Sequence, residues 1–225
     1  MITQIAPSGL HDFVGTLLAK HPRRSGKALD LGTGHGAMAE RLQGMGYEVL
    51  AADQSTQGFE ANIPVVEINF DQPDFAGRLG LHSFDVVTAV EVIEHVESPI
   101  GFLRNIRRLL SPPGFAVITT PNVDSLAARL KHLLYGRIRG MDELGEPTHI
   151  SPIFIELFQR QFLRLANLKL EEHLVFPPRG FQLSRLWVAW LMGMTVRLLP
   201  GNSIAGDHHV FVLSSSEQIK WTFGG

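Results

Sequence analysis

The chain of 225 residues contains no cysteine. Disulfides, zinc sites built on thiolates and cysteine nucleophiles are therefore excluded, and this absence is typical of a cytoplasmic protein. An excess of charge is also lacking, because the formal net charge is only −2 at pH 7, and we expect no nucleic-acid partner. Hydrophobic residues make up 44% of the chain, which is enough for a folded core.

Long hydrophobic runs are lacking as well. Residues 1–19 show no basic start followed by an apolar stretch, so no signal peptide is expected there. The longest apolar run, 186–194, is flanked by Arg185 and Arg197, and it is much shorter than the roughly 20 apolar residues of a membrane span. We therefore expect a cytoplasmic location, with association at a membrane surface as the alternative.

The sequence does contain alternating apolar runs and amphipathic segments. Apolar runs predict strands at 27–31, 47–53, 64–70, 84–90, 115–120, 168–176 and 208–213. Helical spacing predicts helices at 8–20, 37–45, 73–79, 99–110, 124–139, 152–165 and 181–199. Strands that alternate with helices are typical of a three-layer α/β/α fold, with a mostly parallel sheet between helices on both faces.

The first predicted strand runs into a glycine-rich segment at 30–36, Asp-Leu-Gly-Thr-Gly-His-Gly. Its glycines let the backbone turn sharply and approach a ligand, although a lone glycine loop is also an ordinary turn. Asp53, Asp71 and Glu91 end the next three predicted strands. Because the carboxyl ends of parallel strands share one edge of the sheet, these acids predict a nucleoside-binding site there.

The spacing of the glycines separates two classes of ligand. A dinucleotide-binding loop has Gly-x-Gly-x-x-Gly, which lets a pyrophosphate lie on the helix N-terminus. Here the pattern is Gly-x-Gly-x-Gly, and Asp30 lies two residues before it. A carboxylate at that position would repel a pyrophosphate, but it suits the ammonium group of a methionine moiety, directly or through water. The charges therefore favour S-adenosylmethionine over NAD.

Five motifs in order extend this interpretation: 28–36 (ALDLGTGHG), 53–55 (DQS), 69–71 (NFD), 84–96 (FDVVTAVEVIEHV), and the pair 109–114 (LLSPPG) with 119–122 (TTPN). In them the chain resembles the class I methyltransferases, especially the group that contains the ubiquinone-biosynthesis O-methyltransferases. The resemblance spans about residues 27–122. It implies a Rossmann-like seven-stranded sheet, S-adenosyl-L-methionine as the cofactor and S-adenosyl-L-homocysteine as the product.

The resemblance also implies roles for individual residues. The glycine segment and Asp30 would hold the methionine part, Asp53 the ribose, and Phe70 with Asp71 the adenine. The full set of implied cofactor-binding residues is Asp30, Gly32, Thr33, Gly34, His35, Gly36, Asp53, Gln54, Asn69, Phe70, Asp71, Val90, Glu91 and Ile93, of which the last three lie near the sulfonium. Gly58 and Pro64 interrupt the segment after the second strand, which puts the position of Gln54 against the adenine in doubt.

We expect one methyltransferase domain over residues 1–225. Residues 27–122 would form the cofactor-binding core. Residues 123–214 would supply the acceptor side and the last two strands, and 215–225 would form a tail.

Methyl transfer to a hydroxyl group needs a base, and two histidines are candidates for it. His95 follows Glu91 by four residues, and His149 lies just before an amphipathic helix. Either imidazole can exchange a proton near pH 7, although His95 could instead pack or cap a helix, and His149 could anchor the helix that follows it. His208 and His209 begin the last strand, where adjacent side chains point to opposite faces, and we interpret them as a strand end rather than a ligand pair.

A metal site is an alternative at the end of the fourth strand. Glu91, Glu94 and His95 would share one face of a helix, and two carboxylates with an imidazole are suitable ligands for a divalent cation. Some of the resembling quinone O-methyltransferases are metal-dependent, but many relatives carry the Glu-His pair without needing a metal. We therefore assign no metal.

Two segments outside the cofactor motifs bear on the acceptor. The helix at 181–199 is apolar on most sides, and 129–139 mixes leucines with basic residues. A core or subunit interface explains the first, and a solvated amphipathic helix explains the second. The functional alternatives are a lid over a lipophilic acceptor and a peripheral contact with a membrane. We expect a small, hydrophobic acceptor, and a monomer or homodimer.

Oxygen is favoured as the methylated atom, because the sequence lacks the Asn/Asp-Pro-Pro-aromatic motif of amino-methylating enzymes. Carbon remains open. Two other functions compete with an O-methyltransferase. A nicotinamide-dependent oxidoreductase is disfavoured by Asp30 and the glycine spacing. A non-catalytic domain that binds a partner through the apolar helix is disfavoured by the intact cofactor motifs.

Overall fold

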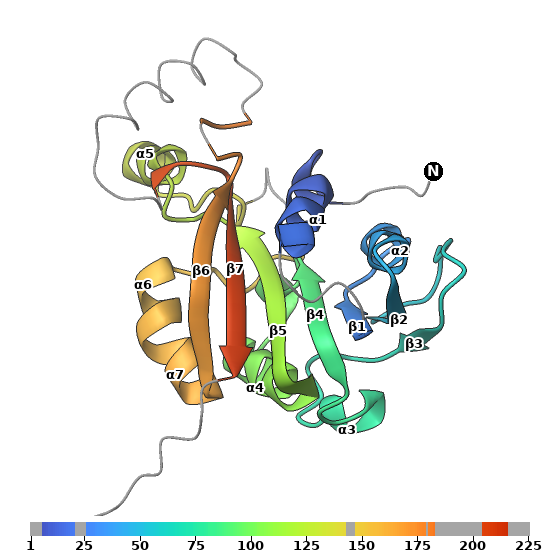
Figure 1. The fold of residues 1–225 in the computed structure, drawn as a ribbon. Helices are drawn as coiled ribbons and strands as arrows, with labels where there is room; N and C mark the ends of the chain where they lie inside the picture. The colour runs from blue at the N-terminus through green and yellow to red at the C-terminus, as the bar shows by residue number, and fades with distance from the viewer. Residues whose placement is uncertain (1–5, 21–25, 143–146, 179, 183–203, 216–225) are drawn as a thin grey trace, which may run out of the picture.

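The computed structural model describes residues 6–20, 26–142, 147–178, 180–182 and 204–215. A seven-stranded sheet in the order β3-β2-β1-β4-β5-β7-β6 forms its centre (Figure 1). Strands β1 to β5 are parallel, and β7 is antiparallel to both of its neighbours. The predicted Rossmann-like, mostly parallel sheet is therefore confirmed. Its strands are β1 (Gly26–Leu31), β2 (Tyr47–Asp53), β3 (Val65–Glu67), β4 (Phe84–Val90), β5 (Leu110–Pro121), β6 (Leu168–Phe176) and β7 (His208–Ser215).

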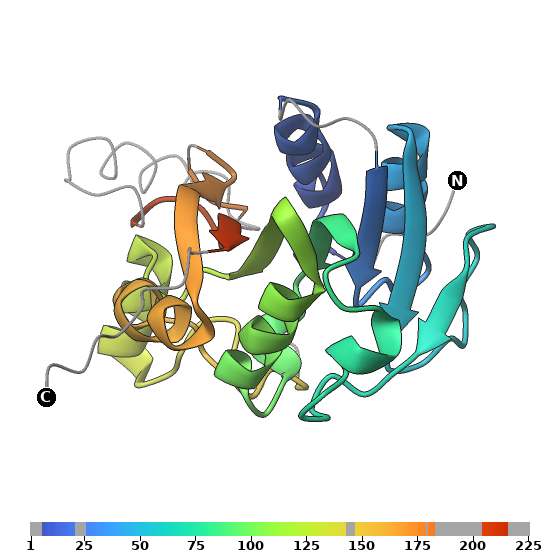
Figure 2. The same ribbon diagram turned by 60° about the horizontal axis from the view of Figure 1, so that its bottom comes forward.

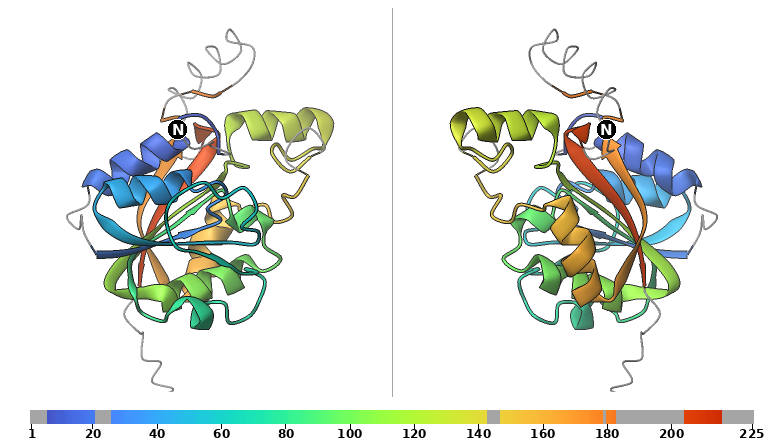
Figure 3. Two further views of the ribbon diagram at one scale, coloured as in Figure 1. Left: turned by 90° about the vertical axis from the view of Figure 1, so that its right-hand side faces the viewer. Right: turned by 90° about the vertical axis from the view of Figure 1, so that its left-hand side faces the viewer.

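Helices cover both faces of the sheet, as Figure 2 and Figure 3 show. One face carries α1 (Leu10–Lys20) and α2 (Ala37–Gly44). The other carries α3 (Ala76–Leu79), α4 (Pro99–Leu109) and the continuous segment made of α6 (Ile155–Leu157), η2 (Phe158–Phe162) and α7 (Leu163–Ala166). Helix α5 (Leu126–Tyr135) projects beyond the edge where the parallel strands end.

Two apolar cores hold these layers together. Leu10, Val14 and Met38 pack onto the first face, whereas the rings of Phe158 and Phe211 stack at 4.4 Å on the second. The inner strands are buried on both sides, as expected of a parallel sheet between two helical layers. This packing fixes the carboxyl ends of β1, β2, β4 and β5 along one edge.

The third strand is shorter than predicted. It ends at Glu67 instead of residue 70, so Asp71 lies in the turn that follows the strand and not at its end. Pairing with β2 stops at Glu67, opposite Asp53. The apolar residues beyond it, Ile68 and Phe70, lie in the buried core, which explains why the strand was predicted to be longer.

Two helices also differ from the predicted ranges. The predicted helix at 124–139 is confined to α5 because the hydroxyl of Ser125 accepts the N–H of Ala128 at its start and Gly136, with φ +66°, ends it. The predicted helix at 152–165 begins later and contains the π-helical turn η2, which apolar spacing does not reveal.

The predicted apolar helix at 181–199 falls almost entirely on residues 183–203, which lie outside the described residues, and the tail from residue 216 does too. Among the helices that the structure describes, none has the length and apolar character needed to cross a membrane.

Candidate active site

A cavity of about 960 Å³ opens at the edge where the parallel strands end. The segments after β1, β2 and β4 line it, together with α1, the start of β7 and the residues around α5. The cavity brings together eleven predicted site residues: Gly32, Thr33, Gly34, His35, Asp53, Gln54, Phe70, Val90, Glu91, His95 and His149. Five others lie outside its lining: Asp30, Gly36, Asn69, Asp71 and Ile93.

The glycine loop is fixed between β2 and β4. Gly32 and Gly34 adopt φ values of +68° and +54°, which glycine tolerates best. A Cβ atom on Gly32 would lie 2.3 Å from Cγ2 of Val92, so the loop backs directly onto the segment after β4. The N–H of Gly34 donates to Oδ2 of Asp53 at 2.8 Å. This bond holds the Asp53 carboxylate at the cavity wall, where it can accept from ribose hydroxyls.

His35 and Gln54 lie where the loop meets the segment after β2. Nδ1 of His35 is 2.6 Å from the carbonyl oxygen of Gly58 and 3.3 Å from the carboxylate of Glu60. His35 therefore ties this irregular segment to the glycine loop. Gln54, whose position the sequence left in doubt, lines the cavity beside Asp53.

Asp30 lies beneath the loop rather than on the cavity surface. Its residue is only 1% exposed, and its Oδ1 accepts the hydroxyl of Thr88 at 2.7 Å. Burial raises the pKa of Asp30 to about 6, against the hydrogen bonds of Thr88 and Thr33 that lower it. Asp30 therefore supports the loop from below and does not line the cavity.

Three predicted residues build the wall behind Phe70. Oδ1 of Asn69 accepts the N–H of Asp71 at 2.8 Å, and Oδ1 of Asp71 accepts the N–H of Glu97 at 2.8 Å. Ile93 is fully buried in the core. These contacts fix the turns around Phe70, which is the member of this group that reaches the cavity.

Glu91 and His208 meet at the centre of the edge. Nδ1 of His208 lies 2.9 Å from Oε2 of Glu91, and the Thr119 hydroxyl donates to Oε1 at 2.7 Å. Burial lowers the pKa of His208, but the adjacent Glu91 carboxylate outweighs it and raises the pKa above its ordinary value. His208 begins β7, as interpreted from the sequence, and it also lines the cavity.

The structure changes one member of the alternative metal set. Glu91, with φ +56°, lies outside the helical turn η1 (Ile93–His95) and does not share its face. Instead, donor atoms of Glu94, His95 and His149 all lie within 4.8 Å of one another. Their imidazole rings meet edge to face at 4.6 Å, and Nε2 of His149 is 3.9 Å from Oε1 of Glu94. We assign no metal to this cluster.

Other charged residues of the cavity wall were not identified from the sequence, because their partners are not adjacent to them in the chain. Lys131 pairs with Asp142 at 2.5 Å, and Arg139 forms a short ion pair with Asp207. All four residues line the cavity, together with His11 of α1. The sequence contains one indication of a buried role for His11, which is its position on the apolar face of its predicted helix.

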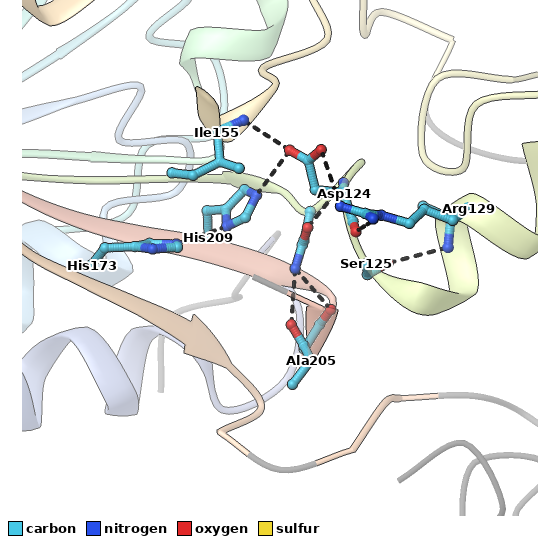
Figure 4. A network of polar contacts seen from close by, with 10 residues as sticks. Asp124, Ser125, Arg129, Ile155, His173, Ala205 and His209 are labelled. Carbon is cyan, nitrogen blue, oxygen red and sulfur yellow. Dashed lines mark hydrogen bonds and ion pairs between the residues drawn. The ribbon is translucent and has the colours of Figure 1, made fainter. Parts of the chain in front are cut away.

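A polar network fixes the acceptor-side segments to the sheet (Figure 4). Oδ2 of Asp124 accepts the N–H of Ile155 at 2.8 Å and lies 3.9 Å from Nε2 of His209. Nδ1 of His209 is 3.0 Å from Nε2 of His173, whose pKa is lowered to about 4 by burial and by the charge of His209. The network thus joins the start of α5, the start of α6 and strands β6 and β7. His208 and His209 are adjacent strand residues, so their side chains point to opposite faces of the sheet, and His209 points away from Glu91, the partner of His208.

Together, the parallel sheet with its antiparallel last strand, the glycine loop after β1 and the acid at the end of β2 define an α/β domain of the class I methyltransferase type. A model of the family described as "Methyltransferase domain" matches residues 4–173. The chain belongs to this family of S-adenosylmethionine-dependent methyltransferases.

Relatives and solved structures agree with this assignment. The chain is 36% identical over 130 residues to a ubiquinone biosynthesis O-methyltransferase of Roseobacter denitrificans, covering 53% of this chain and 49% of that protein. The chain thus spans about half the length of that relative. With the same-named protein of Ruegeria pomeroyi it shares 32% identity over 77% of this chain and 73% of the relative.

Solved structures show the fold. A SAM-dependent methyltransferase from Archaeoglobus fulgidus superposes with a TM-score of 0.59 at 17% identity, over 91% of this chain and 94% of the other. The 1,6-didemethyltoxoflavin-N1-methyltransferase of Burkholderia thailandensis gives the same score at 16% identity, over 92% of this chain and 78% of the other.

The cavity fits the cofactor of this family. Its size is that of a pocket for a nucleoside-sized ligand, and its wall combines a close backbone approach at Gly32 and Gly34 with the carboxylate of Asp53. Phe70 supplies an apolar ring on the same side.

Proposed function

We propose that this chain transfers a methyl group from S-adenosylmethionine to a hydroxyl oxygen of a small, hydrophobic acceptor. The observation that carries this proposal is the composition of the cavity. The glycine loop and Asp53, which we call the cofactor wall, line the cavity together with four further histidines, His11, His95, His149 and His208. A cofactor-binding loop and groups that can accept a proton, brought together in one cavity, are what methylation of a hydroxyl group requires.

On the cofactor wall, the loop at 32–36 would hold the methionine part, Asp53 the ribose and Phe70 the adenine. The bound cofactor supplies a methyl carbon on a sulfonium, which is a good leaving group. The chain's own residues align the acceptor, exclude water and accept its proton. His95 and His149 are the candidates for this last role that the sequence indicates.

The acceptor's hydrophobic character is supported by α5. Leu133, Leu134 and Tyr135 are 79%, 68% and 72% exposed, although they are large apolar residues. Lys131 lies on the same helix and lines the cavity, and Arg129 adds a second cation. Exposed apolar side chains among cations suit a surface of anionic lipid. The names of the relatives, which refer to ubiquinone biosynthesis, support a lipophilic acceptor methylated at oxygen.

Titration calorimetry with S-adenosylhomocysteine and with NAD tests the cofactor, and mass spectrometry of products from a panel of hydroxyaryl acceptors tests the reaction. We expect S-adenosylhomocysteine to bind and NAD not to bind. We expect the products to be ethers in which a methyl group replaces the hydroxyl hydrogen of the acceptor. Binding of NAD alone would favour an oxidoreductase. Binding of S-adenosylhomocysteine without turnover on any acceptor would favour a non-catalytic domain, and methylation at nitrogen would contradict the choice of oxygen.

The role of Asp53 has a matched control. Asp53→Asn should weaken S-adenosylhomocysteine about tenfold or more, because it removes a charged acceptor of hydrogen bonds. Asp74→Asn makes the same chemical change at an exposed site that pairs with Arg108, and it should leave this affinity unchanged. Equal affinities for the two variants would remove Asp53 from the site.

The membrane contact is tested by co-sedimentation with vesicles that contain about one third phosphatidylglycerol. The wild-type chain should bind, whereas Leu133→Glu should not, because the substitution puts a charge on the exposed apolar face. Leu165, on α7, is also exposed, and Leu165→Glu is the control that should still bind. No binding by the wild-type chain would overturn this part of the proposal.

A further inference from the structure

Glu91 and His208 come from distant parts of the sequence and form one pair in the cavity wall. Glu91 directly follows β4, and His208 is the first residue of β7. Oε2 of Glu91 and Nδ1 of His208 are 2.9 Å apart, and both residues line the cavity. The pair is possible because β7 is antiparallel to β5, so it begins at the edge where the parallel strands end, with His208 opposite Pro121.

Glu91 is held in an unusual conformation that aims it at His208. Its φ of +56° lies in the left-handed region, which costs a non-glycine residue about 1 kcal/mol or more. Two bonds to Thr119 maintain it: the Glu91 N–H donates to Oγ1 at 3.0 Å, and the Thr119 hydroxyl donates to Oε1 at 2.7 Å. Backbone strain of this kind is concentrated at functional sites.

The pair also fixes which nitrogen of His208 can react. A carboxylate only accepts hydrogen bonds, so Nδ1 of His208 carries the hydrogen that Glu91 receives. Within the part of the chain that the structure describes, Nε2 has no hydrogen-bond partner. In the neutral imidazole this second nitrogen is a free base at the cavity wall.

We propose that His208, oriented by Glu91, is the general base that receives the proton of the acceptor's hydroxyl group. The inference rests on the proposed function. The hydroxyl oxygen forms its new bond to the methyl carbon while the carbon–sulfur bond breaks and returns its electron pair to sulfur. The O–H proton passes to Nε2 of His208. The products are a methyl ether, S-adenosylhomocysteine and an imidazolium, which later releases its proton to water.

The position of the pair relative to the cofactor wall agrees with this role. The glycine loop backs onto Val92, the residue next to Glu91. In the sheet, β4 lies beside β1, and β7 follows after β5. Glu91 and His208 therefore lie between the cofactor wall and the α5 side, where an acceptor would meet the methyl group.

His149 is less suited to be this base. Its Nδ1 is 2.7 Å from the carbonyl oxygen of Gly140, and its Nε2 is directed at buried Glu94, 3.9 Å away. Both ring nitrogens therefore face protein groups. Nδ1 of His95 contacts the carbonyl oxygen and the hydroxyl of Thr148.

Several charges face the pair. Asp207, the residue before β7, raises the pKa of His208, and Arg139, from the segment after α5, lowers it. Glu91 itself is faced by His11 of α1 and by Glu94 of η1. Glu91 is the nearest of the charges acting on His208, so its removal should shift the acidic limb of the rate profile to lower pH.

The substitution His208→Asn distinguishes a role of His208 as general base from a purely structural role as the partner of Glu91. The asparagine amide keeps an N–H near the Nδ1 position, where it can still donate to Glu91, but it has no basic nitrogen. We expect kcat to fall about 100-fold or more, with the affinity for S-adenosylhomocysteine changed by less than twofold. A kcat close to that of the wild-type chain would overturn the proposal.

Glu91→Gln tests the orienting role. We expect a lower kcat and an acidic limb displaced to lower pH, whereas Glu97→Gln, the same change at an exposed position, should alter neither. An unchanged profile in Glu91→Gln would contradict the coupling of the two residues.

A measurement without turnover keeps the inference separate from the proposed function. In the chain labelled with ¹⁵N-histidine, the imidazole shifts of His208, assigned by their loss in His208→Asn, should report the Nδ1–H tautomer. This preference should weaken in Glu91→Gln. An Nε2–H tautomer in the wild-type chain would overturn the inference even if methyl transfer occurs. A chain that neither binds S-adenosylhomocysteine nor methylates would refute the proposed function while leaving this readout interpretable.

Discussion

Asp30 is a carboxyl group that the fold buries beneath the glycine loop, and its burial has a cost that can be measured. The pKa of Asp30 rises from 3.8 to about 6 in the folded chain, chiefly through desolvation. The folded carboxyl thus keeps its proton to higher pH than the unfolded one. This contribution favours the folded state below pH 3.8 and is lost as the pH rises through 6. Because a tenfold change in proton affinity corresponds to about 1.4 kcal/mol, the loss approaches about 3 kcal/mol.

Asp30→Asn removes the titrating group while keeping an oxygen that can accept the Thr88 hydroxyl. The free energy of unfolding of the variant, minus that of the wild-type chain, should therefore increase by up to about 3 kcal/mol between pH 4 and pH 7. Urea unfolding at a series of pH values measures this difference. Asp12→Asn, at an exposed carboxylate of α1, is the control and should give a nearly constant difference.

A difference for Asp30→Asn that stays constant with pH would refute the reasoning. The same substitution should weaken S-adenosylhomocysteine, because the proposed role of Asp30 is to favour the ammonium group of the methionine part. A variant that is more stable and binds less tightly would show that the chain retains a costly buried carboxyl for function.

Three further predictions concern the loop, the histidine network and α5. Gly32→Ala should destabilise the chain by about 1–3 kcal/mol and abolish binding of S-adenosylhomocysteine, because its Cβ would clash with Val92 at a positive φ. Gly44→Ala, whose Cβ would meet nothing within 4 Å, should be neutral or stabilising in the same urea and calorimetry measurements. The free energy of unfolding should fall by about 1–2 kcal/mol as the pH drops from 6.5 to 4, because folded His173, with a pKa of about 4, resists the proton that the unfolded chain accepts. In His173→Gln this part of the pH dependence should disappear. Ser125→Ala should cost about 1 kcal/mol in urea unfolding through the loss of the α5 cap, and an unchanged midpoint would contradict the role of Ser125 as the cap.

Some strands were predictable to the residue from their apolar runs. The apolar runs at 84–90 and 168–176 coincide with β4 and β6. The third strand was not, because Ile68 and Phe70 continue an apolar pattern after pairing with β2 has ended. The π-helical turn η2 was also missed, because apolar spacing does not distinguish it from a regular α-helix.

The two acids predicted to bind the cofactor, Asp53 and Asp71, also differ in how far local sequence determines their positions. Asp53 was placed correctly at the cavity because it ends a strand, and the register of that strand is fixed locally by its neighbours. Asp71 was expected at the cavity too, but it lies beyond the end of β3, where its carboxylate accepts the N–H of Glu97. No sequence pattern within either segment predicts this bond, because it joins two turns that come together only in the folded chain.

The acceptor side depends still more on such long-range contacts. His208 lies on a strand whose own alternation gave no reason to choose it, and it meets Glu91 only because β7 reverses direction beside β5. The cofactor side, by contrast, is built by short turns after consecutive parallel strands. Substitutions in the later segments can therefore change the acceptor and its base without disturbing the glycine loop. The cofactor of this chain could therefore be predicted from its sequence, whereas the residues proposed to act on the acceptor could be identified only in the fold.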